Sequence, residues 1–355
     1  MAGILIKNGR IWDGEQFAFG DVFIRDGIIE RIAPQIREKA NFSFDATDML
    51  VTPGLVDAHI HIQGPEPDPY GINAEMCTIP FGATAAADAG GAHGDKTFAQ
   101  AHLLKNVTFV TVPIRNNLPV FTRTEEKLRA YGDNAIGLKV YFDDENPQIL
   151  DISPLQTICA YARERGLKVM VHCTDSPTPM AQILETLAPG DILTHAFHGG
   201  RSTAAEDDFA SMIAAQKRGI VIDTGFAGNV HTDFEIFRAA IAKGILPDTI
   251  STDITRASAY KRGGRYGLTM AMSMARTAGM EEADILRAVT VNPAKALGKA
   301  GAWGCLREGG CADVAVLCYT DEGFDLTDRA GNRLVSDQGY RCKLTVANGD
   351  VVYRH

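Results

Sequence analysis

Two histidines stand one residue apart at the end of an apolar run in the stretch GLVDAHIHIQG, residues 54–64. In a β-strand the side chains alternate between faces, so His59 and His61 would point the same way. Neutral imidazoles on one face can share a divalent metal such as Zn²⁺. The alternative is that two polar residues occupy one solvated face of a strand. The other strands of the chain decide between these interpretations.

The middle of the chain, residues 53–304, alternates between apolar runs and helix-like segments. The apolar runs that end in polar residues are GLVDAHIH, ATAAADAGG, VTFVTVPIRNN, AIGLKVYFDD, LKVMVHCTD, DILTHAFHGG, IVIDTGFAGN and DTISTDITR. Eight strands alternating with helices predict an α/β fold, a (β/α)8 TIM barrel. A doubly wound open sheet is the competing arrangement. The count of eight and the lack of a Gly-rich dinucleotide turn after the first strand favour the barrel.

Both ends of the chain have the pattern of short strands joined by turns. Residues 1–52 and 305–355 contain Asn-Gly or Asp-Gly pairs, which mark tight hairpins. We expect the two ends to combine into one small β domain, a β-sandwich, beside a catalytic barrel formed by residues 53–304.

A barrel would gather a ring of reactive side chains, because active sites of this fold lie at the C-terminal ends of the strands. The strand-end residues are His59 and His61 on strand one, Lys139 on strand four, His172 on strand five, His195 on strand six and Asp253 on strand eight. Each has a simple structural alternative: Lys139 could extend toward the mouth, and Asp253 could pair with Arg256. Together they predict a metal site, and imidazole and carboxylate ligands suit zinc.

An inward-pointing Lys139 needs an explanation, because a free ammonium would repel a dication. Carbamylation by CO₂, which gives N6-carboxylysine, turns the amine into a carboxylate that can bridge two metal ions. Two-metal chemistry would follow, in which a bridging water is acidified and one ion polarises a carbonyl.

These residues, together with VTPGLVDAHIH, TVNPAKALG and GCLREGGCADVAVL, resemble the amidohydrolase superfamily over essentially the whole chain. The strand endings IGLKVY, ILTHAFHG and PDTISTDI are similar to those of its dihydroorotase-like and deacetylase-like members. The resemblance implies that Asp253 is the catalytic residue that carries the proton from hydroxide to leaving group. It also implies the ligand sets: His59, His61 and Asp253 for one metal, His172 and His195 for the second, and carbamylated Lys139 bridging both.

Cationic and polar residues after several strands are candidates for substrate binding. They are Arg115 and Asn116 after strand three, His198 after strand six, Asn229 after strand seven, and Arg256, Arg265 and Tyr266 after strand eight. Guanidinium groups bind carboxylates through paired hydrogen bonds, so these positions suggest a small carboxylate-bearing substrate. The alternatives are a solvated loop that pairs with DDEN at 143–146, and plain loop structure for His198, Asn229 and His231.

We therefore predict a binuclear metal-dependent hydrolase that cleaves an amide, cyclic amide or ester bond by attack of a metal-bridging hydroxide, as a deacetylase or esterase does. A hydantoinase, dihydroorotase or isoaspartyl-dipeptidase activity would use the same site. A mononuclear deaminase normally lacks the strand-four lysine. A non-catalytic binding homologue usually lacks several of the ligands.

Composition limits the partners and the compartment. The formal net charge of −9 over 355 residues argues against nucleic acid. No apolar run approaches the roughly 20 residues of a membrane span, and the N-terminus lacks a signal-peptide pattern. The seven cysteines include no C-x-x-C pair, which fits reduced thiols. We expect a cytoplasmic enzyme for a small molecule, with no nucleic-acid or membrane partner; barrels of this kind commonly form homo-oligomers.

Overall fold

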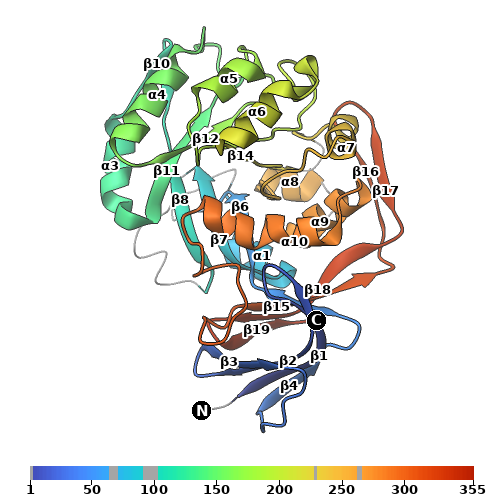
Figure 1. The fold of residues 1–355 in the computed structure, drawn as a ribbon. Coiled ribbons are helices and arrows are strands. Elements are labelled where there is room, and N and C mark those ends of the chain that lie inside the picture. Colours follow the sequence, from blue (N-terminus) through green and yellow to red (C-terminus); the bar gives the residue numbers. More distant parts are fainter. Residues whose placement is uncertain (1–2, 64–70, 91–102, 228–229, 262–265) are drawn as a thin grey trace.

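The barrel is formed by parallel strands in the computed structural model, which describes residues 3–63, 71–90, 103–227, 230–261 and 266–355 (Figure 1). Seven strands pair in chain order: β6 (Leu55–Ile60), β7 (Ala83–Gly90), β8 (Lys105–Thr111), β11 (Ala135–Tyr141), β12 (Lys168–His172), β13 (Ile192–Thr194) and β14 (Val221–Ile222). The segment 249–254 closes the ring, since Thr249 bridges Asp223 and Ile254 bridges Ile60, both in parallel. Seven of the eight predicted strands are thus present, and the eighth segment is joined to its two neighbours by isolated bridges. Every residue of β6 is buried, as expected for a strand covered on both faces.

Most of the helices cover the outside of the barrel, while α8 (Arg256–Lys261) contributes Ala257 and Ser258 to the pocket at its mouth. The helices are α1 (Ala74–Thr78), α3 (Thr122–Tyr131), α4 (Ser153–Glu164), α5 (Met180–Thr186), α6 (Ala210–Arg218), α7 (Phe234–Ala242), α8, α9 (Leu268–Thr277), α10 (Glu282–Val289) and α11 (Val291–Ala296), with short 3₁₀ turns at Ile79–Phe81, Gly132–Asn134 and Ala204–Asp207. In α4 the buried residues Leu155, Ile158, Cys159 and Ala162 follow helical spacing, so one face packs on the barrel. None of the helices in the described parts of the chain is long and apolar enough to cross a bilayer.

The two ends of the chain build a separate β domain below the barrel (Figure 1). Its strands are β1 (Ile4–Trp12), β2 (Phe17–Arg25), β3 (Ile28–Ala33), β4 (Phe42–Asp45), β5 (Leu50–Pro53), β15 (Val314–Thr320), β18 (Gly339–Ala347) and β19 (Asp350–Arg354). They form one eight-stranded sheet in the order β19-β18-β15-β5-β1-β2-β3, with β4 paired to β1. This sheet packs around its own apolar core, which includes Ile6, Val22 and Val316, in the place where the sequence predicted a small β-sandwich.

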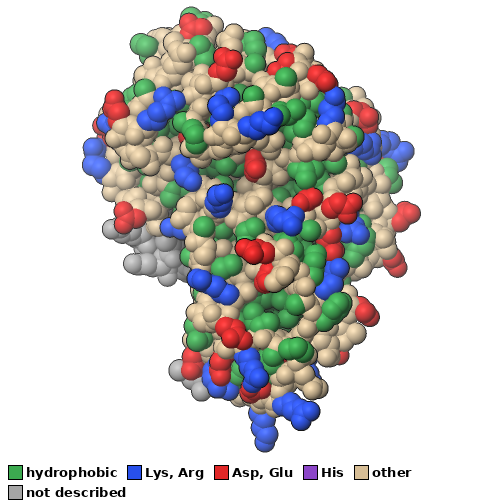
Figure 2. Space-filling view, viewed as in Figure 1, with side chains coloured by type: hydrophobic (Ala, Val, Ile, Leu, Met, Phe, Trp, Pro, Cys, Tyr) green, Lys and Arg blue, Asp and Glu red, His purple; other side chains and the backbone are tan. Residues whose placement is uncertain are grey.

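A hairpin leaves the β domain and runs alongside the barrel. Its strands, β16 (Phe324–Thr327) and β17 (Arg333–Ser336), pair only with each other among the described residues, and the hairpin reaches α7 (Figure 1). Phe324 and Leu334 are buried in the large core that includes the barrel helices. A second, short hairpin joins β9 (Ile114–Arg115) to β10 (Leu118–Pro119) after barrel strand β8. On the face shown in Figure 2, acidic and basic side chains are interspersed over both domains.

Candidate metal centre

The first group of potential ligands comes from the first and last strands of the barrel. His59 lies in β6 and His61 follows it, and the Nε2 atoms of both approach the same oxygen of Asp253, at 3.2 and 3.0 Å from Oδ1. Asp253 lies at the end of the closing segment, where its backbone N–H donates to the carbonyl of His59 at 2.8 Å. The three ligand atoms are within reach of one ion, so the structure brings together the predicted first metal set.

Lys139 lies beside this group in β11. Its side chain is completely buried, and its Nζ is 3.1 Å from His59 Nε2. Burial lowers the pKa of Lys139 to about 8, while the nearby Asp253 opposes this shift. A neutral amine is nucleophilic, which is the state that carbamylation requires.

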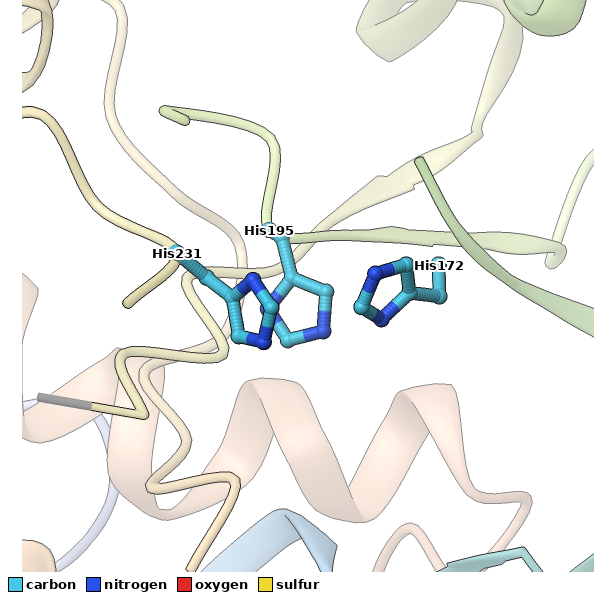
Figure 3. Close-up of side chains that lie close together, drawn as sticks. All are labelled: His172, His195 and His231. Atoms are coloured by element: carbon cyan, nitrogen blue, oxygen red, sulfur yellow. The ribbon is translucent and has the colours of Figure 1, made fainter. Parts of the chain in front are cut away.

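A second group consists of three imidazoles, those of His172, His195 and His231, whose rings form a triangle (Figure 3). The ring centroid of His195 is 4.4 Å from that of His172 and 4.2 Å from that of His231, and the centroids of His172 and His231 are 4.8 Å apart. One ligand nitrogen from each ring lies within 4.8 Å of the others, so the three can hold one ion. The sequence predicted two of them as ligands. His231 lies in the loop after β14, where no strand register indicates its direction, so the sequence suggests a loop residue or a substrate contact there and not a metal ligand.

Hydrogen bonds fix which nitrogen of each imidazole faces the centre. The hydroxyl of Thr194 donates to the carboxylate of Asp223 at 2.7 Å, so it accepts from His59 Nδ1, 2.8 Å away. His195 Nδ1 donates to the carbonyl of Gly225 at 2.7 Å, and its buried Nε2 has no partner among the described residues. Metal-bound histidines typically donate their other nitrogen in this way, and a buried nitrogen without a partner fits an ion as its partner.

Burial also holds these side chains in the protonation states that a metal needs. Burial, with a contribution from the charge of Lys139, lowers the pKa of His59 to about 4. Burial lowers the pKa of His172 and of His195 well below the ordinary value. For Asp253, burial opposes ionisation, but His59 and His61 hold its pKa well below the usual range. Neutral imidazoles and an ionised carboxylate are the ligand forms of zinc sites, so the donor set fits the predicted metals.

A pocket of about 730 Å³ opens over both groups of ligands, a size suited to a small molecule. Its wall contains members of both groups, together with acidic, amide and hydroxyl side chains. The lining residues are His61, Ile62, Asp88, Gly90, Tyr141, Asp143, Glu145, Asn146, His172, Ala227, Val230, His231, Asp253, Thr255, Ala257 and Ser258. One member, Asp143, has a carboxylate oxygen 3.5 Å from His172 Nε2, where it can orient that ring.

The residues predicted to bind substrate lie mostly away from this wall. Arg115 is exposed in β9, and the backbone N–H of Asn116 donates to the side chain of Gln148. His198 is buried and makes a contact with the carbonyl of Gly199. Tyr266 packs against Phe81, with ring centroids 5.4 Å apart.

Three predicted substrate residues remain. Arg256 is exposed at the start of α8, between the lining residues Thr255 and Ala257. Asn229 and Arg265 lie outside the described residues.

The profile of the amidohydrolase family matches residues 50–352, which is most of the chain. The chain belongs to the amidohydrolase family. It is 27% identical to a deacetylase of Agrobacterium fabrum over 330 residues, covering 86% of this chain and 80% of that protein. It is 26% identical to a dihydroorotase of an Anaeromyxobacter species, covering 99% and 98% of the two chains.

Solved structures share the fold. A dihydroorotase superposes with a TM-score of 0.85 at 24% identity, covering 100% of this chain and 98% of the other. An adenine deaminase does so with a TM-score of 0.83 at 22% identity, covering 99% of both chains. The TIM-barrel fold predicted from the sequence is confirmed, and the family and its relatives make this amidohydrolase a hydrolase that acts on C–N bonds.

Proposed function

We propose that this amidohydrolase is a binuclear enzyme, with two divalent ions held by the two groups of ligands. The observation that carries the proposal is the convergence of both groups, with Lys139 beside them, under one pocket. Lys139 contacts His59, and its charge also lowers the pKa of His172 and His195, so it lies near both groups. This placement supports carbamylated Lys139 as a bridge, and the nitrogen and oxygen ligands favour zinc.

The proposed reaction is hydrolysis of an amide, cyclic amide or ester bond. Bound ions would acidify water and polarise the scissile carbonyl. Asp253, ionised and placed between the imidazoles of His59 and His61 and the pocket, would accept the proton of the attacking water and return it to the leaving group. The buried floor around His59 and His195 would keep bulk water away from the reacting bond.

The substrate class we favour is an acylated small acid, cleaved as a deacetylase would cleave it. The similarity to deacetylases over most of the chain supports this choice. Arg256, next to the lining residues Thr255 and Ala257, is the proposed partner of the substrate carboxylate. A cyclic amidase activity is the second candidate, because the similarity to dihydroorotases spans nearly the full length of both chains.

The test is metal analysis followed by a substrate panel. The full chain, loaded with Zn²⁺ in the presence of bicarbonate, is expected to hold two ions and to hydrolyse N-acyl or O-acyl acids. Hydantoins, dihydroorotate and β-aspartyl dipeptides in the same panel would distinguish the second candidate. Asp253→Asn should bind substrate without turnover. A folded chain that holds no metal and hydrolyses no member of the panel would overturn the proposal.

A further inference from the structure

The tip of the β16–β17 hairpin belongs to the β domain by sequence but contacts loops at the catalytic face of the barrel. Asp328, which begins the tip, is buried, and its Oδ2 accepts a hydrogen bond of 2.8 Å from the backbone N–H of Phe234. Asn332, which ends the tip, donates to Asp328 and, at 3.4 Å, to the side chain of Asp233. Asp233 and Phe234 begin α7 two and three residues after His231, so the tip holds the loop that carries this imidazole.

A second contact of the tip reaches the loop after β12. The guanidinium of Arg329 pairs with Asp175 Oδ2 at 2.5 Å, and the Asp175 side chain is only 14% exposed. The other oxygen of Asp175 accepts from the backbone N–H of Arg201 at 3.0 Å, in the loop after β13. Asp175 directly follows Thr174, so this ion pair and the hydrogen bond from Arg201 help to hold the backbone beside Thr174.

The side chains of Thr174 and His231 are in contact. The hydroxyl of Thr174 lies 3.0 Å from His231 Nδ1, while Nε2 of the same ring is 3.9 Å from Asp253 Oδ2. One hydrogen bond therefore joins the two loops that the hairpin tip holds, and it directs the other nitrogen of His231 to the metal centre. Partners of this kind orient metal-binding imidazoles, and their loss weakens metal binding.

We propose that the hairpin tip is a positioning element for the second metal: Asp328 and Arg329 hold the Thr174–His231 pair so that His231 completes the His172 and His195 site. This inference rests on the proposed binuclear function. The first site draws its ligands from β6 and from the closing segment, which no described contact joins to the tip. Substitutions in the tip should therefore weaken binding of the second ion and not of the first.

The test is a two-site titration of the full chain with Zn²⁺ against a competing chelator, repeated with Co²⁺ and read by its visible absorption. Arg329→Gln should weaken the second site by about two- to fivefold and leave the first site unchanged, because a half-exposed ion pair that acts through Asp175 and Thr174 contributes modestly. Arg329→Lys should restore most of the affinity. His231→Ala should weaken the second site at least as much as Arg329→Gln and should change the Co²⁺ spectrum of that site.

Arg333→Gln is the matched control, because Arg333 pairs at 2.5 Å with Asp325 on the same hairpin, where both side chains are more than half exposed. It should bind both ions as the wild-type chain does. An unchanged second site in Arg329→Gln, equal weakening of both sites, or the same weakening in Arg333→Gln would overturn the inference. A wild-type chain that binds fewer than two ions would instead contradict the proposed function itself.

Discussion

Removing the hydroxyl of Thr194, which lies beneath the candidate metal centre, tests most directly how His59 is oriented. This hydroxyl donates to Asp223 and accepts from His59 Nδ1, so it fixes the tautomer that leaves His59 Nε2 free for a metal. Asp223 also accepts from Thr249 and Ser251 at 2.6 and 2.8 Å, which holds the carboxylate, and through it the Thr194 hydroxyl, in place. Thr194→Val keeps the shape of the side chain and deletes the hydroxyl, and with it the hydrogen bonds to Asp223 and His59.

The expected effect has two parts. Losing the partner of a metal-bound histidine typically lowers metal affinity 10- to 100-fold, or about 1.4–2.7 kcal/mol. The buried Nδ1–H of His59 would also lose its acceptor, which lowers the free energy of unfolding by about 1–3 kcal/mol. Chelator competition measures the first part, and urea denaturation of the metal-free chain measures the second.

Thr345→Val provides the control for a lost buried hydroxyl. The hydroxyl of Thr345 donates to the carbonyl of Ile79 at 2.8 Å in the interface between the two domains, far in sequence from any ligand. This variant should lose similar stability with unchanged metal affinity. Thr194→Ser should retain both properties. Wild-type metal affinity in Thr194→Val would refute the assignment of His59 Nε2 as a ligand atom.

Three further predictions concern the same centre. Lys139→Ala should reduce the zinc content from two ions to about one per chain, measured by atomic absorption, and an unchanged content would exclude the bridge. Gly225→Ala should weaken both sites, because Gly225 has a φ of +48° and an added Cβ would press against the Thr194 hydroxyl and lie 2.6 Å from His195 Nδ1. Calorimetric titration with Zn²⁺ measures this, and normal binding would contradict it. Removing the metals should lower the melting temperature, since ions at 1,000 times their Kd stabilise the folded chain by about 4 kcal/mol. Equal melting temperatures with and without Zn²⁺ would contradict this and show that the ions bind the folded and the unfolded chain equally.

The barrel and most of the candidate ligands could be predicted because strand periodicity fixes the direction in which side chains point. His59 and His61 point the same way in a strand, and the strand ends of a barrel meet on one face. Local patterns were therefore enough to predict that Asp253 lies near this pair and that His172 lies near His195. Lys139 was predicted for the same reason, as a polar residue inside an otherwise apolar strand.

The supporting residues could not be predicted in the same way. His231 lies in a loop, and its direction depends on Thr174 in another loop and on contacts to a hairpin almost 100 residues away in sequence. Thr194 looks like an ordinary strand residue, because β-branched side chains are common in strands whether or not they support a site. The tip residues Asp328 and Arg329 lie in a polar stretch that, from the sequence alone, is a plain surface turn.

Anomalous diffraction at the zinc edge, from crystals of the full chain grown with Zn²⁺ and bicarbonate, tests the central claim most directly. The account predicts two peaks per chain, one among His59, His61 and Asp253 and one among His172, His195 and His231, with density for a carbamate on Lys139 between them. A single peak, or two peaks away from these side chains, would contradict a binuclear centre.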